Sequence, residues 1–151
     1  MKNLQQLFSA VVLLVIALTA VSCSSDDEVL SVEGGMTGTW EVASEQFLID
    51  GEDLNIPRSI TKVPAEGSTI QFNADKSLLI MSDTTVSNNA WRAGADQNLF
   101  IALQDENVET EFAVRSLTHS SVTLYHIGEG DLNGDGNLNK IEIIIGLTRA
   151  K

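Results

Sequence analysis

The chain has 151 residues, of which 21 are acidic and 9 are Lys or Arg, so its formal net charge at pH 7 is −12. Such an acidic chain repels the phosphate backbone, which excludes general binding to DNA or RNA through counterion release. One cysteine and two histidines exclude an intrachain disulfide and a four-ligand Cys/His zinc site. The hydrophobic fraction of 43% is typical of a globular protein, although part of it lies in one N-terminal block. The length predicts one small domain.

Residues 1–22 have the layout of a secretory signal peptide. Lys2 precedes a nearly unbroken apolar run over residues 10–20, which is too short to span a bilayer comfortably. The small residue Ser22 then precedes Cys23, the only cysteine. Residues 20–23 (Ala-Val-Ser-Cys) resemble a bacterial lipobox, with Ala where Leu is usual. The resemblance implies cleavage before Cys23 and a lipid on Cys23 that anchors the protein in the bacterial outer membrane. A free secreted protein or an uncleaved anchor is the alternative.

Residues 23–36 are predicted to form an acidic tether. Their first part, Ser-Ser-Asp-Asp-Glu at 24–28, lacks the apolar content needed to pack. A serine and acidic run after a lipidated cysteine resembles the signal that directs some Gram-negative lipoproteins to the cell surface. The alternative is a solvated spacer that carries no targeting signal. Residues 1–22 contain one basic and no acidic side chain, so their removal leaves a net charge of −13.

The remaining chain, residues 37–151, is predicted to be all-β, because short β-rich runs recur between turn signals and no helical period is visible. The first strand is expected over residues 39–49, where a break in alternation indicates a bulge, and it ends at Asp50-Gly51. Residues 54–67 contain both prolines and are expected to form a long loop or lid. The other expected strands are 69–72, 77–81, 90–92, 99–103, 112–115, 122–127 and 141–148, with hairpin turns at 73–76 and 117–120.

About eight strands joined mostly by short turns favour a small antiparallel up-and-down barrel, with a β-sandwich as the main alternative. Gly-Thr-Trp at 38–40 is similar to the G-x-W signature of the lipocalin fold. Residues 70–77 resemble the I-x-F-x-x-D-G hairpin of lipocalin-like domains in bacterial lipoproteins, with Lys76 in place of the last Gly. The resemblance implies that Trp40 closes one end of the barrel beneath a basic residue of the last strand, here Arg149. An ordinary core position is the other interpretation of Trp40, and both predict its burial.

The strongest motif for chemistry lies at residues 131–142, which fit the twelve-residue calcium loop of the EF-hand at every position. Gly136 occupies position 6, where the chain must turn sharply. The expected oxygen ligands at positions 1, 3, 5, 7, 9 and 12 are Asp131, Asn133, Asp135, Asn137, Asn139 and Glu142. Calcium prefers six to eight hard oxygens, which alternate side chains of a curled loop can supply. Because the flanks have strand patterns, we expect one calcium site between the last two strands. The alternative is a metal-free hairpin, since Asn-Gly and Asp-Gly form turns without an ion.

The other polar side chains are weaker candidates. His119 and His126 have no evident nucleophile beside them, so we expect solvent-facing or hydrogen-bonded roles. A group of carboxylates surrounds the loop before the sixth strand: Asp105, Glu106, Glu109 and Glu111. In so acidic a chain such a group is expected to be a solvated face rather than a catalytic pair. The sequence therefore predicts no catalytic residue and no enzyme. It predicts a lipid-anchored envelope module that binds calcium and contacts a protein or glycan, or alternatively a carrier of a small apolar ligand.

Overall fold

The computed structural model describes residues 30–53, 64–82, 85–103, 108–131 and 136–151. The predicted signal peptide, Cys23 and the run at 24–28 lie outside the described residues. So do Asn133 and Asp135 of the predicted calcium loop, Asp105 and Glu106, and most of the predicted lid.

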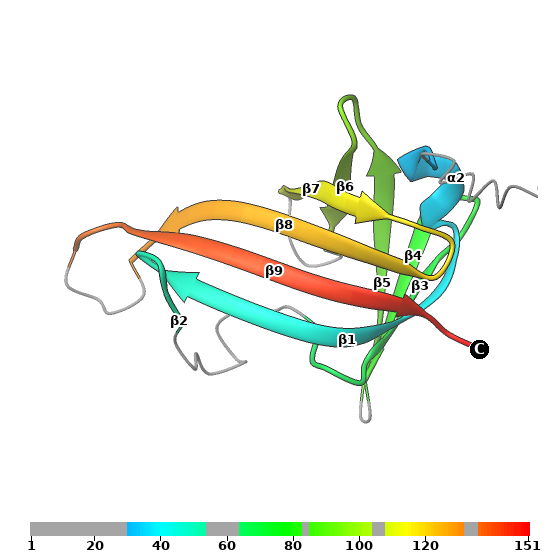
Figure 1. Cartoon of the computed structure of the whole chain (residues 1–151), viewed down its shortest axis with the longest axis horizontal. Helices are drawn as coiled ribbons and strands as arrows, with labels where there is room; N and C mark the ends of the chain where they lie inside the picture. The colour runs from blue at the N-terminus through cyan, green and yellow to red at the C-terminus, as the bar shows by residue number, and fades with distance from the viewer. Residues whose placement is uncertain (1–29, 54–63, 83–84, 104–107, 132–135) are drawn as a thin grey trace, which may run out of the picture.

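The described residues form one antiparallel β-sheet that closes into a barrel (Figure 1). Strands β3 to β8 each pair with the next strand along the chain, and β1 pairs with both β3 and β9, so that eight strands close the barrel. The ninth strand, β2, pairs only with the end of β1. The prediction of an all-β, up-and-down barrel is therefore confirmed. The elements are α2 (Val32–Met36), β1 (Gly38–Ile49), β2 (Glu52–Asp53), β3 (Thr69–Phe72), β4 (Ser77–Ser82), β5 (Thr85–Ala93), β6 (Asn98–Ala102), β7 (Glu109–Leu117), β8 (Ser121–Gly130) and β9 (Asn139–Arg149).

The first strand contains the predicted bulge. Its register against β9 shifts between Val42 and Ser44, and the bulge brings Ser44 opposite Gly146. A side chain at position 146 would overlap the Ser44 hydroxyl, so glycine is what allows the two strands to approach there. The bulge explains why the alternation in the sequence changes phase within one continuous strand.

Besides the short strand β2, which was not expected, two elements differ from the expected pattern. Strand β5 begins at Thr85 rather than near residue 90, because its polar half pairs with β4 while its side chains stay largely exposed. Backbone pairing and polar side-chain contacts such as that of Ser82 with Thr85 hold this part of the strand, so its sequence shows no alternation of polar and apolar residues. The second element is α2, which lies in the range assigned to the tether. Val32 and Met36 are buried against the barrel, so the packed domain begins before residue 37.

One end of the barrel is closed by α2, Trp40 and Arg149. Trp40 is fully buried, and its indole Nε1 donates to the carbonyl oxygen of Met36 at 2.7 Å. The Arg149 guanidinium carbon lies 4.2 Å from the centroid of the Trp40 ring, as the sequence predicted. The guanidinium also donates to three carbonyl oxygens, those of Gly35, Thr37 and His119. Arg149 thereby ties α2, the start of β1 and the β7–β8 turn together.

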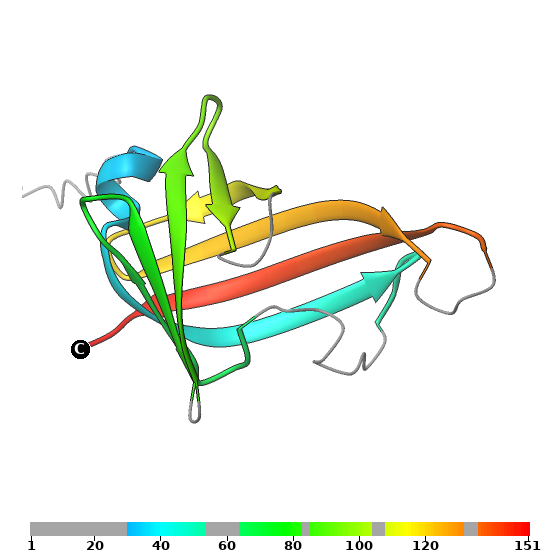
Figure 2. The same cartoon turned by 180° about the vertical axis from the view of Figure 1, so that it is seen from behind.

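The strands have unequal lengths, which shapes the other end. Strands β1, β8 and β9 extend together well beyond the shorter strands β3 to β6 (Figures 1 and 2). Side chains from both groups fill the interior near Trp40, including Phe72, Leu78, Leu99 and Leu124. The long strands β8 and β9 then carry Gly130 and Asn139, the last pair of their ladder, away from this core.

Candidate functional site

The predicted calcium loop connects β8 to β9 at the tip of the long strands. The last pair of the β8–β9 ladder joins Gly130 to Asn139. Directly beyond it, Oδ2 of Asp131 accepts a hydrogen bond from the backbone N–H of Gly136 at 2.9 Å. Gly136 has a φ of +85°, a conformation that glycine adopts without steric cost. Asp131, the first predicted ligand, is thus hydrogen-bonded to Gly136, the residue at the expected sharp turn.

The ninth loop position is held by a turn of another strand pair. Asp50, in the β1–β2 turn, accepts from the Asn139 side-chain amide at 2.9 Å and from the Lys140 backbone N–H at 3.0 Å. Its own backbone N–H donates to the Lys140 carbonyl at 2.9 Å. The hydrogen bond from Asn139, followed by that from Lys140, lowers the pKa of Asp50. Asp50 therefore fastens the beginning of β9 to the end of β1.

The twelfth loop position lies within the sheet. Oε1 of Glu142 accepts from Lys140 Nζ at 2.7 Å, and Oε2 accepts from the Tyr125 hydroxyl at 2.5 Å. The Lys140 contact and then the Tyr125 contact lower the pKa of Glu142. The same hydrogen bond to Glu142 raises the pKa of Tyr125, whose ring also lies under the guanidinium of Arg115. Both carboxylate oxygens of Glu142 are thus engaged by neighbouring side chains.

The structure brings only part of the predicted ligand set together. Glu142 pairs with Ile127, whereas the last pair of the ladder is Gly130 with Asn139, three residues nearer to the loop. At about 3.4 Å per residue, Glu142 therefore lies roughly 10 Å along the strand from the end of the ladder. Within the described ranges, which omit residues 132–135, no group of three His, Cys, Asp or Glu side chains could hold a metal. Asp131, Asn137 and Asn139 lie at the loop, and Glu142 reaches it only if the first residues of β9 leave the ladder.

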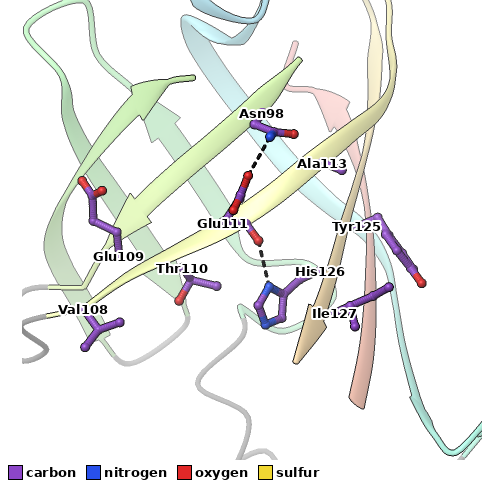
Figure 3. A pocket seen from close by; sticks show the side chains of 9 residues that line it. All are labelled: Asn98, Val108, Glu109, Thr110, Glu111, Ala113, Tyr125, His126 and Ile127. Atoms are coloured by element: carbon purple, nitrogen blue, oxygen red, sulfur yellow. Dashed lines mark hydrogen bonds between the residues drawn. The ribbon is translucent and has the colours of Figure 1, made fainter. Parts of the chain in front are cut away.

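A pocket of about 580 Å³ lies on the wall of the barrel, where β7 and β8 diverge (Figure 3). The β7–β8 ladder ends at the pair Ala113–Tyr125. From there β7 continues towards Glu109 alongside β6, and β8 continues towards Gly130 alongside β9. We call this divergence the β7–β8 wedge, formed by residues 109–112 of β7 and 126–130 of β8.

The imidazole of His126 bridges the wedge. Its Nδ1 lies 2.8 Å from the carbonyl oxygen of Glu111 on β7 (Figure 3). The ring lies beside Gly128, where a Cβ would come within 3.0 Å of Nε2. The expectation of a hydrogen-bonded histidine is met at His126, whereas the β7–β8 wedge was not predicted from the sequence. The signal that could have found it is the run His-Ile-Gly-Glu-Gly at 126–130, because two glycines at alternate positions leave one face of a strand without side chains.

The carboxylates near the wedge are surface groups, as the sequence predicted for Glu109 and Glu111. Glu109 forms an ion pair with Arg92, which lowers its pKa. The Glu111 carboxylate accepts from the Asn98 amide at 2.6 Å. His119 contributes its backbone carbonyl to Arg149.

Comparisons with protein-family models, with characterised proteins and with solved structures return no match to this chain. The part of the chain that the structure describes contains no helix long and apolar enough to cross a membrane.

Proposed function

We propose that the protein is a lipid-anchored module of the bacterial cell envelope that binds one calcium ion through the loop at 131–142. The observation that carries the proposal is the contact from Gly136 N–H to the Asp131 carboxylate. This contact brings the first predicted ligand to the residue at position 6, where a calcium loop must turn sharply around the ion. The donor chemistry also fits, since every predicted ligand is a carboxylate, an amide or a backbone carbonyl.

The proposal requires a rearrangement at Glu142. To provide a bidentate carboxylate, Glu142 must leave Tyr125 and Lys140, and the first residues of β9 must bend towards the loop. The free energy of breaking these contacts is subtracted from the binding free energy. We therefore expect weak, extracellular-type affinity, with a Kd of roughly 10⁻⁴ to 10⁻³ M.

Calcium titration of the purified protein tests occupancy of the loop. Isothermal titration should show one binding event in the wild type and none in Asp131→Ala, because the variant removes the ligand at position 1. Magnesium should bind much more weakly, since it demands a smaller octahedral shell. Glu52→Gln, an exposed carboxylate of β2, is the control for general charge. Identical heats for the wild type and Asp131→Ala would leave the loop as a metal-free turn.

The lipid anchor is tested separately. Cells expressing the wild type should incorporate a labelled lipid precursor into the protein, whereas Cys23→Ser should remain unlabelled, because the chain has no other thiol. In membrane fractionation, the labelled wild type should be found with the membranes and the unlabelled Cys23→Ser variant should not. Equal labelling of both proteins would contradict the lipobox interpretation while leaving the calcium proposal intact.

The pocket beside β7 and β8 supports a binding role, and it keeps a carrier of a small apolar ligand as the second candidate. Its wall combines the exposed Val108 and Ile127 with Thr110, Glu109 and Glu111. A purely apolar ligand would displace water from these polar groups, which costs free energy even where Arg92 and Asn98 still bond the two carboxylates. The lining therefore favours a ligand that can form hydrogen bonds.

A further inference from the structure

We propose that the β7–β8 wedge binds an extended, basic segment of a partner protein, which adds as a strand along the free edge of β8. This proposal goes beyond calcium binding and does not depend on it. The wedge is a place where a closed barrel exposes strand edges, and an exposed edge is a template for another strand.

The orientation of the backbone shows which groups are available on β7. The backbone N–H of Val114 donates to the carbonyl of Gln97 on the β6 side. Since the backbone groups of alternate residues point to the same side of a strand, those of Ala113, Glu111 and Glu109 point to the β8 side. The position of the Glu111 carbonyl beside His126 agrees with this direction.

The same reasoning applies to β8. Tyr125 is paired with Ala113, so its backbone groups point towards β7, as do those of Ile127 and Glu129. In the described residues, no strand pairs with this side of β8 beyond Tyr125. Two N–H groups and two carbonyl oxygens, from Ile127 and Glu129, are therefore presented as a strand edge. This edge is where an added strand would form its main-chain hydrogen bonds.

The side chains around this edge select the partner. Ile127 and Val108 are 51% and 70% exposed, which provides apolar contact for alternate residues of a strand. No Lys or Arg is among the residues that line the pocket, which include Glu109 and Glu111. Glu111 and Glu129 have no ion pair among the described residues, and the chain as a whole carries −12. These charges complement a segment in which basic and apolar residues alternate.

A capped hexapeptide of alternating lysine and valine is the probe. It is added to the ¹⁵N-labelled full chain, once in EDTA and once in millimolar calcium, so that the wedge and the calcium loop are tested independently. We expect the amide signals of Ile127 and Glu129 to shift and to exchange more slowly with solvent. A second peptide carries N-methyl groups on alternate amides, and a third replaces lysine with glutamate. Each of these two control peptides should bind about tenfold more weakly or not at all. The N-methylated peptide loses main-chain hydrogen bonds, and the glutamate peptide loses charge complementarity.

A protein variant completes the test. Glu129→Gln should weaken binding of the lysine peptide severalfold, whereas Glu52→Gln, a matched exposed glutamate on β2, should leave it unchanged. Undiminished binding of the N-methylated peptide would show charge attraction without strand addition and would overturn the proposal. Shifts centred outside the β7–β8 wedge, or no binding in either buffer, would overturn it as well. Failure of calcium titration alone would leave this result unaffected.

Discussion

Trp40→Ala should destabilise the protein by about 3–5 kcal/mol, the usual cost of truncating a large, fully buried aromatic side chain. The substitution removes the fully buried indole from the closed end of the barrel. It also leaves the Met36 carbonyl without its side-chain donor and the Arg149 guanidinium without the ring beneath it. Urea unfolding followed by circular dichroism measures the change, and an unchanged midpoint would contradict the closing role of Trp40.

Three further variants separate packing from hydrogen bonding at this end. Trp40→Phe keeps an aromatic ring in the core but loses part of the buried volume and the bond to Met36, so it should cost less than Trp40→Ala. Arg149→Ala should also cost less, because Arg149 is only partly buried. Arg149→Lys should not restore stability fully, since an ammonium cannot stack on the indole as a planar guanidinium does or reach all three carbonyl oxygens. Equal losses in all four variants would indicate general loosening rather than a specific closure.

Calcium should raise the melting temperature, and EDTA should reverse the effect. If the Kd is about 10⁻⁴ M, calcium at about 100 times the Kd stabilises the folded state by roughly 2.7 kcal/mol through mass action. Glu142→Gln should reduce this stabilisation and Asp131→Ala should abolish it. A melting curve that does not respond to millimolar calcium would contradict the calcium proposal even if the barrel is folded.

Tyr125 reports whether Glu142 moves when calcium binds. It is the only tyrosine of the chain, and its hydrogen bond to Glu142 raises its pKa. If Glu142 turns to the ion, this bond is lost, so the pKa of Tyr125 should fall towards its ordinary value. Absorbance titration of tyrosinate at increasing pH, with and without calcium, measures the shift. An unchanged Tyr125 titration alongside a normal calcium isotherm would mean that the ion is held without Glu142.

The sequence by itself determined the strand order, most turns and the closed end of the barrel. Alternation from Trp40 onward and turn residues such as Asn73 to Lys76 are local signals, because a strand and a tight turn depend on neighbouring residues. The pairing of Trp40 with Arg149 was accessible through the lipocalin-like pattern. The calcium-loop motif was visible because its ligands follow a fixed spacing along the chain, although Asn133 and Asp135 lie outside the described residues.

Only the tertiary structure decided which side chains form hydrogen bonds with the predicted calcium ligands and where two neighbouring strands of the barrel diverge. Asp50 and Asn139 are distant in the chain and meet because β1 and β9 pair, while Glu142 meets Tyr125 across the β8–β9 ladder. The β7–β8 wedge arises because β8 follows the long strand β9 whereas β7 follows the short strand β6. Strand divergence depends on the lengths of the paired neighbours; the two glycines at 128 and 130 of β8 mark the place locally but do not encode those lengths.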